Sequence, residues 1–130
     1  MKEELETLSI RVMTKGKLPS LPFARMKDEV LGTKYELSIL FADRATSRTL
    51  NNTYRGKDYT TNILSFPLTK KTGEIVINLE KVRKDAKEFD KTYEDFLGFL
   101  FIHGLLHLKG MDHGPKMEMQ EKKFCKIFGF

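Results

Sequence analysis

The stretch that decides the fold is residues 92–113, TYEDFLGFLFIHGLLHLKGMDH. Thr92 and Asp95 match a capping box, a pattern that satisfies free N–H groups at the start of a helix. From Phe96 to Leu108 the segment is apolar on nearly every side, and a helix of that composition belongs in the middle of a domain. Gly110 is suited to end such a helix. The segment therefore predicts a central helix that the rest of the chain buries.

Alternating apolar and polar residues, together with short apolar runs, predict the strands around this helix. The predicted strands are Leu8–Val12, Tyr35–Phe41, Ile63–Phe66 and Glu74–Ile77. The last two are joined by the turn-like segment Lys70–Gly73, and strands with so short a connection should pair antiparallel.

Helical periodicity and capping residues predict four further helices. The first runs from Pro22 to Gly32, and the second from Asp43 to about Tyr54. The third, which Asn78 can cap, has as its apolar face Leu79, Val82, Ala86 and Phe89. The last begins at Pro115 and has on one face Phe124, Ile127 and Phe128. The predicted fold class is α+β, with one domain over residues 1–130 in which a small mixed sheet of about four strands packs against about five helices.

The composition is typical of a soluble globular protein. The chain has 130 residues, of which 40% are hydrophobic and 32% charged, and no apolar run reaches the roughly 18 residues of a membrane helix. Its acidic beginning, MKEELETLSIRV, is unlike a signal peptide. We therefore expect a cytoplasmic protein without a membrane partner. Cys125, the only cysteine, excludes an internal disulfide and is expected to be a buried, inert thiol.

Basic residues outnumber acidic ones by 23 to 18, which gives a net charge of +5 and a pI near 9.3. Such an excess favours polyanionic partners through long-range attraction. Many cytoplasmic proteins with other roles are equally basic, so charge alone does not establish nucleic-acid binding.

All three histidines of the chain lie in the central segment. His103 and His107 are four residues apart, so they are separated by about 6 Å along the helix axis and point to one side. Gly110 breaks the helix, which lets His113 approach the same point from another direction. Three imidazoles at about 2.0 to 2.1 Å leave the fourth position of a tetrahedral zinc ion open, as in catalytic zinc sites. We therefore predict one zinc ion per chain on the central helix, held by His103, His107 and His113.

Other interpretations of these residues are less favoured. A single histidine in an apolar helix is usually a core residue, but three at this spacing with a glycine at the bend are difficult to explain in that way. A structural zinc site normally has four protein ligands. Asp112 could be a fourth, but its neighbour His113 would compete for the same approach, so Asp112 is expected to support the site indirectly or to lie at the surface. Nickel, cobalt or copper could take the place of zinc, because each binds imidazole well.

The spacing equals that of metzincin proteases, except that Gly104 stands where those enzymes have a catalytic glutamate. Peptide hydrolysis needs a group that activates water and then protonates the departing amine, and Gly104 can do neither. Phosphodiester cleavage tolerates the loss better, because three neutral ligands leave the charge of the metal uncancelled. The nucleophile could be water at the metal or, in RNA, the 2′-hydroxyl of the substrate. A product with a 3′-hydroxyl end would exclude the second route.

With these residues in view, the sequence closely resembles the YbeY family of bacterial rRNA-maturation endoribonucleases. The family signature is similar to His-Gly-x-Leu-His-Leu-x-Gly-Tyr-Asp-His, and this chain has it over His103–His113 with Met111 in place of the tyrosine. A second family segment resembles Leu50–Pro67, and a third, Gly-Asp-Ile, appears here as Gly73–Ile75. The resemblance extends from about Leu37 to the C-terminus.

This resemblance implies a single-strand-specific, metal-dependent endoribonuclease that matures the 3′ end of small-subunit rRNA and takes part in ribosome quality control. It also implies that the three histidines are zinc ligands, with His103 and His107 in the catalytic site, and that Arg55 binds substrate or acts in catalysis near the metal. The expected partners are RNA, chiefly small-subunit rRNA, and the ribosome or proteins of its small subunit. Candidates for contacts with the RNA backbone are Lys57, Lys70, Lys71 and Lys109.

Several alternatives stay open at this point. Asn62 replaces an aspartate of the family, and an amide keeps hydrogen bonding but not basicity. The general base is Glu74, Asp58 or no residue at all. Two other functions compete with the nuclease. One is a zinc-stabilised ribosome-assembly factor that binds RNA without cutting it, and the other, less favoured because of Gly104, is a zinc metallopeptidase.

Overall fold

A computed structural model describes residues 7–130, and the acidic beginning of the chain, residues 1–6, lies outside the described residues. The described part forms four strands and five helices, in the order β1 (Leu8–Val12), α2 (Phe23–Leu31), β2 (Glu36–Phe41), α3 (Arg44–Arg55), β3 (Ile63–Pro67), β4 (Thr72–Ile77), α4 (Leu79–Glu88), α5 (Tyr93–Leu108) and α6 (Pro115–Phe128). The predicted α+β class is confirmed. Within residues 7–130, no helix is both long and apolar enough to cross a membrane.

The four strands form one mixed sheet in the order β1-β2-β4-β3. Strands β1 and β4 each run parallel to β2, whereas β3 pairs antiparallel with β4, as the short turn between them predicts. Side chains alternate across a strand, so the odd-numbered residues of β3 and β4 face one side of the sheet and the even-numbered residues face the other. The register agrees with this, because Ser65 lies opposite Ile75 and Leu64 opposite Val76.

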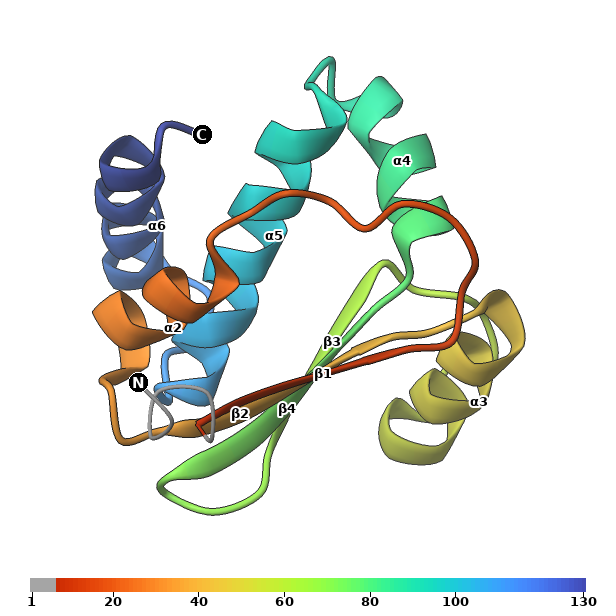
Figure 1. Cartoon of the computed structure of the whole chain (residues 1–130), viewed down its shortest axis with the longest axis horizontal. Coiled ribbons are helices and arrows are strands. Elements are labelled where there is room, and N and C mark those ends of the chain that lie inside the picture. The colour runs from red at the N-terminus through yellow and green to blue at the C-terminus, as the bar shows by residue number, and fades with distance from the viewer. Residues whose placement is uncertain (1–6) are drawn as a thin grey trace.

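Most of the core lies on the side of the sheet that carries α2, α4, α5 and α6 (Figure 1). Helix α5 is at its centre, and the prediction of a central buried helix is confirmed by the fully buried side chains of Leu97, Phe101, Ile102, Leu105 and Leu106. Helix α3 packs on the other side of the sheet, where Leu50 covers a smaller cluster made of Leu40, Ala42, Leu64 and Val76. The sheet is therefore covered on both sides, but unequally.

A glycine lets α5 lie directly on the sheet. A Cβ atom at Gly104 would be 2.9 Å from Ser65 Oγ and 3.3 Å from the Cδ1 atoms of Ile63 and Ile75. The Ser65 hydroxyl donates a hydrogen bond of 3.1 Å to the carbonyl oxygen of Gly104. The close contact holds the neighbouring His103 at the edge of the sheet that β3 forms.

The predicted helix caps are confirmed. The side chains of Asp43, Asn78 and Thr92 each accept a hydrogen bond from the backbone N–H group three residues later. This is the usual action of an N-cap residue, and it fixes where α3, α4 and α5 begin.

Two residues assigned to apolar helix faces are exposed instead, and both assignments are wrong. Helix α4 ends at Glu88, so Phe89 lies beyond it, 63% exposed and stacked on Phe96. On α6 the buried stripe passes through Met117 and Phe124, and Ile127 falls outside it.

Cys125 is half-buried rather than fully buried as predicted. Burial nevertheless raises the pKa of its thiol, which keeps the sulfur protonated and agrees with an inert side chain.

Candidate metal centre

The turn after α5 places the third histidine. Gly110 has a φ of 99°, a conformation that glycine adopts without strain. Its N–H donates to the carbonyl of His107 at 2.9 Å, and the N–H of Met111 donates to the carbonyl of Leu106 at 3.0 Å. These two bonds are the Schellman pattern of a helix end. The chain thus reverses at the predicted glycine, and His113 returns to the two histidines of the helix.

The three imidazoles converge on one point. His103 Nε2 and His107 Nε2 are 3.0 Å apart, and the ring centroid of His113 lies 4.9 Å from that of His103 and 5.0 Å from that of His107. One nitrogen from each ring lies within 4.8 Å of the others, so the group could hold a metal ion. Nitrogen ligands of a tetrahedral zinc ion are about 3.3 Å apart. The spacing of the two helix histidines is close to that value, and the donor set fits zinc.

The second ring nitrogen of each helix histidine is already used. His103 Nδ1 donates to Oε2 of Glu121 at 2.5 Å, and His107 Nδ1 donates to the carbonyl oxygen of Met111 at 3.1 Å. A hydrogen on Nδ1 leaves the lone pair on Nε2, which is the nitrogen that faces the common point. Burial, and then the nearby His103, lower the pKa of His107. A lower pKa favours the neutral ring, which is the form that binds a metal.

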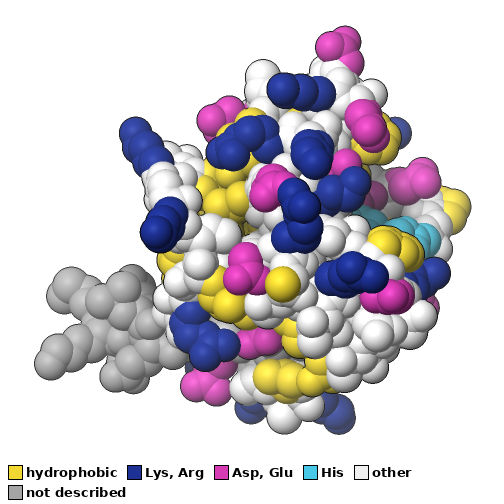
Figure 2. Space-filling model, turned by 90° about the vertical axis from the view of Figure 1, so that its right-hand side faces the viewer, with side chains coloured by type: hydrophobic (Ala, Val, Ile, Leu, Met, Phe, Trp, Pro, Cys, Tyr) yellow, Lys and Arg dark blue, Asp and Glu magenta, His cyan; other side chains and the backbone are white. Residues whose placement is uncertain are grey.

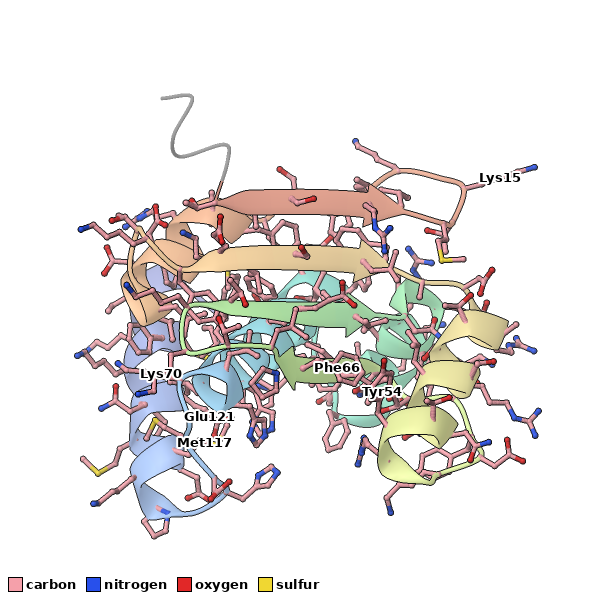
Figure 3. The ribbon with its side chains drawn as sticks, turned by 90° about the horizontal axis from the view of Figure 1, so that it is seen from below. Lys15, Tyr54, Phe66, Lys70, Met117 and Glu121 are labelled. Carbon is pink, nitrogen blue, oxygen red and sulfur yellow. The ribbon has the colours of Figure 1, made fainter. Side chains whose placement is uncertain are left out.

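Glu121 was not predicted to belong to the site. It lies on α6, is only 8% exposed and lies one helical turn from Met117 (Figure 3). The sequence holds one signal for it, because Met117, Glu121 and Phe124 follow the repeat of a buried helix face. A carboxylate in such a stripe has to find a partner, since an unpaired buried charge is costly. The partner here is His103.

A cleft of about 660 Å³ opens beside the histidines. One wall holds Gly104 and the three histidines, and the other is formed by the whole of β3, with Tyr54 and Arg55 from the end of α3. In Figure 2 the histidine side chains, in cyan, reach the surface at the right of the view, with hydrophobic, basic and acidic side chains around them. Arg55 therefore lines the same cleft as the three histidines.

Neither carboxylate considered as a general base lines this cleft. Asp58 lies 2.9 Å from the Nε of Arg48, and this guanidinium lowers the pKa of the carboxyl group. Glu74 lies on the opposite side of the sheet from α5, because its neighbours Gly73 and Ile75 face that helix. The general base was expected to be Glu74, Asp58 or no residue at all, and the geometry supports the last of these three alternatives.

Asn62 lines the cleft together with the histidines, but its amide is bonded to α4. Its Nδ2 donates to Oδ2 of Asp85 at 3.0 Å. Asp85 is buried and also pairs with Lys81 at 3.0 Å. An aspartate at position 62 would place two carboxylates together at this point, so the amide suits the chain for a structural reason.

The other residues considered lie at the surface or act through the backbone. Asp112 is exposed, as one of its two interpretations predicted. Met111, which replaces the family tyrosine, holds His107 through its carbonyl oxygen, a contact that any side chain at 111 would permit. Among residues 7–130, the lysines considered for RNA contacts are all exposed, and none lines the cleft: Lys57, Lys70, Lys71 and Lys109.

Comparison with known proteins gives a consistent result. The family model described as Endoribonuclease YbeY matches residues 8–127. The Endoribonuclease YbeY of Alkaliphilus metalliredigens is 37% identical over 131 residues, covering 92% of this chain and 81% of the relative. That of Alteromonas mediterranea is 37% identical over 129 residues, covering 94% and 81%. The solution structure of TM1509 from Thermotoga maritima has a TM-score of 0.64 and 29% identity, covering 92% of this chain and 89% of that one.

Proposed function

Because the chain belongs to the YbeY family of endoribonucleases, we propose that it is a zinc-dependent enzyme that cuts single-stranded RNA in small-subunit rRNA 3′-end maturation and in ribosome quality control. One zinc ion per chain is held by His103, His107 and His113. The partners are small-subunit rRNA and the small ribosomal subunit or its proteins, in the cytoplasm. The observation that carries the proposal is a cleft whose lining, among residues 7–130, contains three imidazoles and Arg55 but no carboxylate.

The charges of this cleft suit a phosphodiester. Three neutral imidazoles do not cancel the charge of a divalent ion, and the Arg55 guanidinium adds a further positive charge. A zinc ion bound there would polarise a phosphoryl oxygen and make water acidic enough to react near neutral pH. The planar guanidinium of Arg55 can bind two phosphate oxygens at once and stabilise the negative charge that grows on them during cleavage.

The same cleft argues against a peptidase. A glutamate at position 104 would begin with a Cβ atom 2.9 Å from Ser65 Oγ, inside the contact between α5 and β3. In the described part of the chain, the lining of this cleft holds no carboxylate that could activate water and then protonate a departing amine, and Glu118 and Glu121 line a separate pocket beside His103 and His113. The geometry therefore favours a substrate whose leaving group can depart without protonation by a carboxylic acid of the protein.

Untagged protein and a 3′-extended fragment of small-subunit rRNA test the proposal. Protein stripped by a chelator is expected to be inactive, and one equivalent of zinc should restore cleavage in unpaired regions but not in duplex regions. End-group analysis then identifies the nucleophile, because a 3′-hydroxyl end excludes attack by the 2′-hydroxyl. If the zinc-loaded protein binds the fragment tightly and leaves it intact, the assembly-factor alternative takes precedence.

Glu121→Ala is expected to weaken zinc binding by about 10- to 100-fold, the usual effect of removing a carboxylate that orients a ligating histidine. Without the acceptor at Nδ1, the ring of His103 is free to turn its Nε2 away from the ion. Competition with a chelator measures the dissociation constant. Glu121→Gln keeps an acceptor oxygen and should lose less affinity.

Glu118→Ala is the matched control, because Glu118 lies one turn earlier on α6, is exposed and lines the same small pocket as His103 and His113, whereas the hydrogen bond to His103 comes from Glu121. It removes the same charge from the same helix and should bind zinc like the wild type. If Glu121→Ala also bound zinc like the wild type, its contact with His103 would have no role in orienting the ligand.

A further inference from the structure

An aromatic pair lines the cleft where the end of α3 meets the edge strand β3. Tyr54, in the last turn of α3, is 64% exposed. Its ring packs against that of Phe66 on β3, with the centroids 4.7 Å apart and the planes tilted by 54° (Figure 3). Both residues line the cleft together with the three histidines. Phe66 thus supports the ring of Tyr54 and leaves most of it accessible.

We propose that Tyr54, supported by Phe66, is a stacking platform for one unpaired base of the RNA, beside the phosphate that Arg55 holds. The inference rests on the proposed function and adds to it a means by which the cleft selects single-stranded RNA.

The position of Tyr54 in the chain connects the base to the phosphate. Tyr54 immediately precedes Arg55 at the end of α3, and consecutive Cα atoms are about 3.8 Å apart. Both side chains line the same cleft, so a base on the tyrosine and a phosphate at the arginine can belong to the same nucleotide or to adjacent ones. The cleft of about 660 Å³ has room for a ligand of this size, and the histidines line it as well.

A nucleobase is the ligand that suits an exposed aromatic ring in a positively charged cleft. Every base has a flat π-face, so aromatic side chains bind single strands with little sequence preference. Within a duplex both faces of a base are covered by its neighbours, so only an unstacked base can lie on Tyr54. The arginine then supplies a contact to the backbone, and the tyrosine supplies a contact that a duplex cannot make.

The test uses zinc-loaded protein and a short single-stranded oligoribonucleotide in which 2-aminopurine replaces one base at a time. The fluorescence of 2-aminopurine falls when it stacks, and it is read on mixing, before cleavage. Wild-type protein is expected to quench one position strongly. Tyr54→Leu still covers Phe66 with an apolar side chain but cannot stack, so it should lose this quenching and bind about 10-fold more weakly. Tyr54→Phe should keep both the quenching and the affinity of the wild type, because a phenylalanine ring can also stack.

Tyr59→Leu is the matched control, because Tyr59 is also an exposed tyrosine, at 53%, and does not line the cleft. Tyr59→Leu should quench the fluorescence of 2-aminopurine and bind the oligoribonucleotide as the wild type does. Unchanged quenching and affinity in Tyr54→Leu, or an equal loss in Tyr59→Leu, would overturn the platform. A wild-type protein that quenches one position but does not cut RNA would keep the platform and reject the proposed nuclease, so the two failures are distinguishable.

Discussion

His107→Ala is expected to purify without zinc and to have no metal-dependent ribonuclease activity. The substitution removes one of three imidazoles whose nitrogens lie within 4.8 Å of one another, and two remaining ligands do not make a stable zinc site. His107 is held as a ligand, because its Nδ1 donates to the Met111 carbonyl and its Nε2 lies 3.0 Å from that of His103. Elemental analysis gives zinc per chain, and the rRNA fragment gives the activity of the same preparation.

Metal-stripped wild-type protein is the appropriate control for this variant. After incubation with zinc, the stripped wild type should regain one ion per chain and its activity, whereas His107→Ala should regain neither. Thermal unfolding of the two metal-free proteins shows whether the variant keeps the fold. One zinc per chain in the variant would contradict the assignment of His107 as a ligand, and equal cleavage by both preparations would indicate a contaminating ribonuclease.

The convergence of the three histidines was largely predictable because its signals are local. The cap at Thr92, the apolar run of α5, the helical spacing of His103 and His107 and the glycine at 110 all lie within one continuous segment. The turn after α5 needs only a residue that tolerates a φ of 99° at position 110, which sequence reasoning can supply.

The contacts that cross between elements were harder to predict. His103 and Glu121 are 18 residues apart in the chain, and their contact depends on how α6 packs against α5. A glutamate in a helix with many charged residues looks like a surface residue, and only its place in the buried stripe distinguishes it. The pairing of Asn62 with Asp85 depends likewise on the packing of α4 beside the end of β3.

The sequence could not predict, for a different reason, that Glu74 lies on the side of the sheet away from the histidines. Alternation along β4 predicts that Glu74 and Ile75 face opposite sides of the sheet. Which side α5 covers follows from the strand order β1-β2-β4-β3, and that order depends on parallel pairings between distant segments. Phe89 was assigned to α4 because apolar periodicity continues past Glu88, but the chain turns there and Asp90 has a φ of 54°.

Arg55→Ala is expected to lower turnover by about 100- to 1,000-fold, the usual cost of removing one group that stabilises charge in a transition state. The arginine lines the same cleft as the histidines but is not one of the three clustered imidazoles, so zinc should stay at one ion per chain. A contact that strengthens as the phosphate gains charge affects kcat more than KM. Steady-state cleavage of a short single-stranded RNA gives both constants, and Arg55→Lys should recover only part of the rate because an ammonium cannot bind two phosphate oxygens in one plane.

Arg48→Ala is the control that separates this local role from a general effect of charge. Arg48 lies on the same helix, pairs with Asp58 and does not line the cleft. Both variants remove one positive charge from α3, so any loss of long-range attraction to RNA should be similar in the two. A large fall in kcat for Arg55→Ala alone would place the guanidinium at the reacting phosphate. Equal losses of activity in the two variants would mean that Arg55 contributes only to the long-range electrostatic attraction of RNA. Loss of zinc in Arg55→Ala would mean that Arg55 supports the metal site and not the substrate.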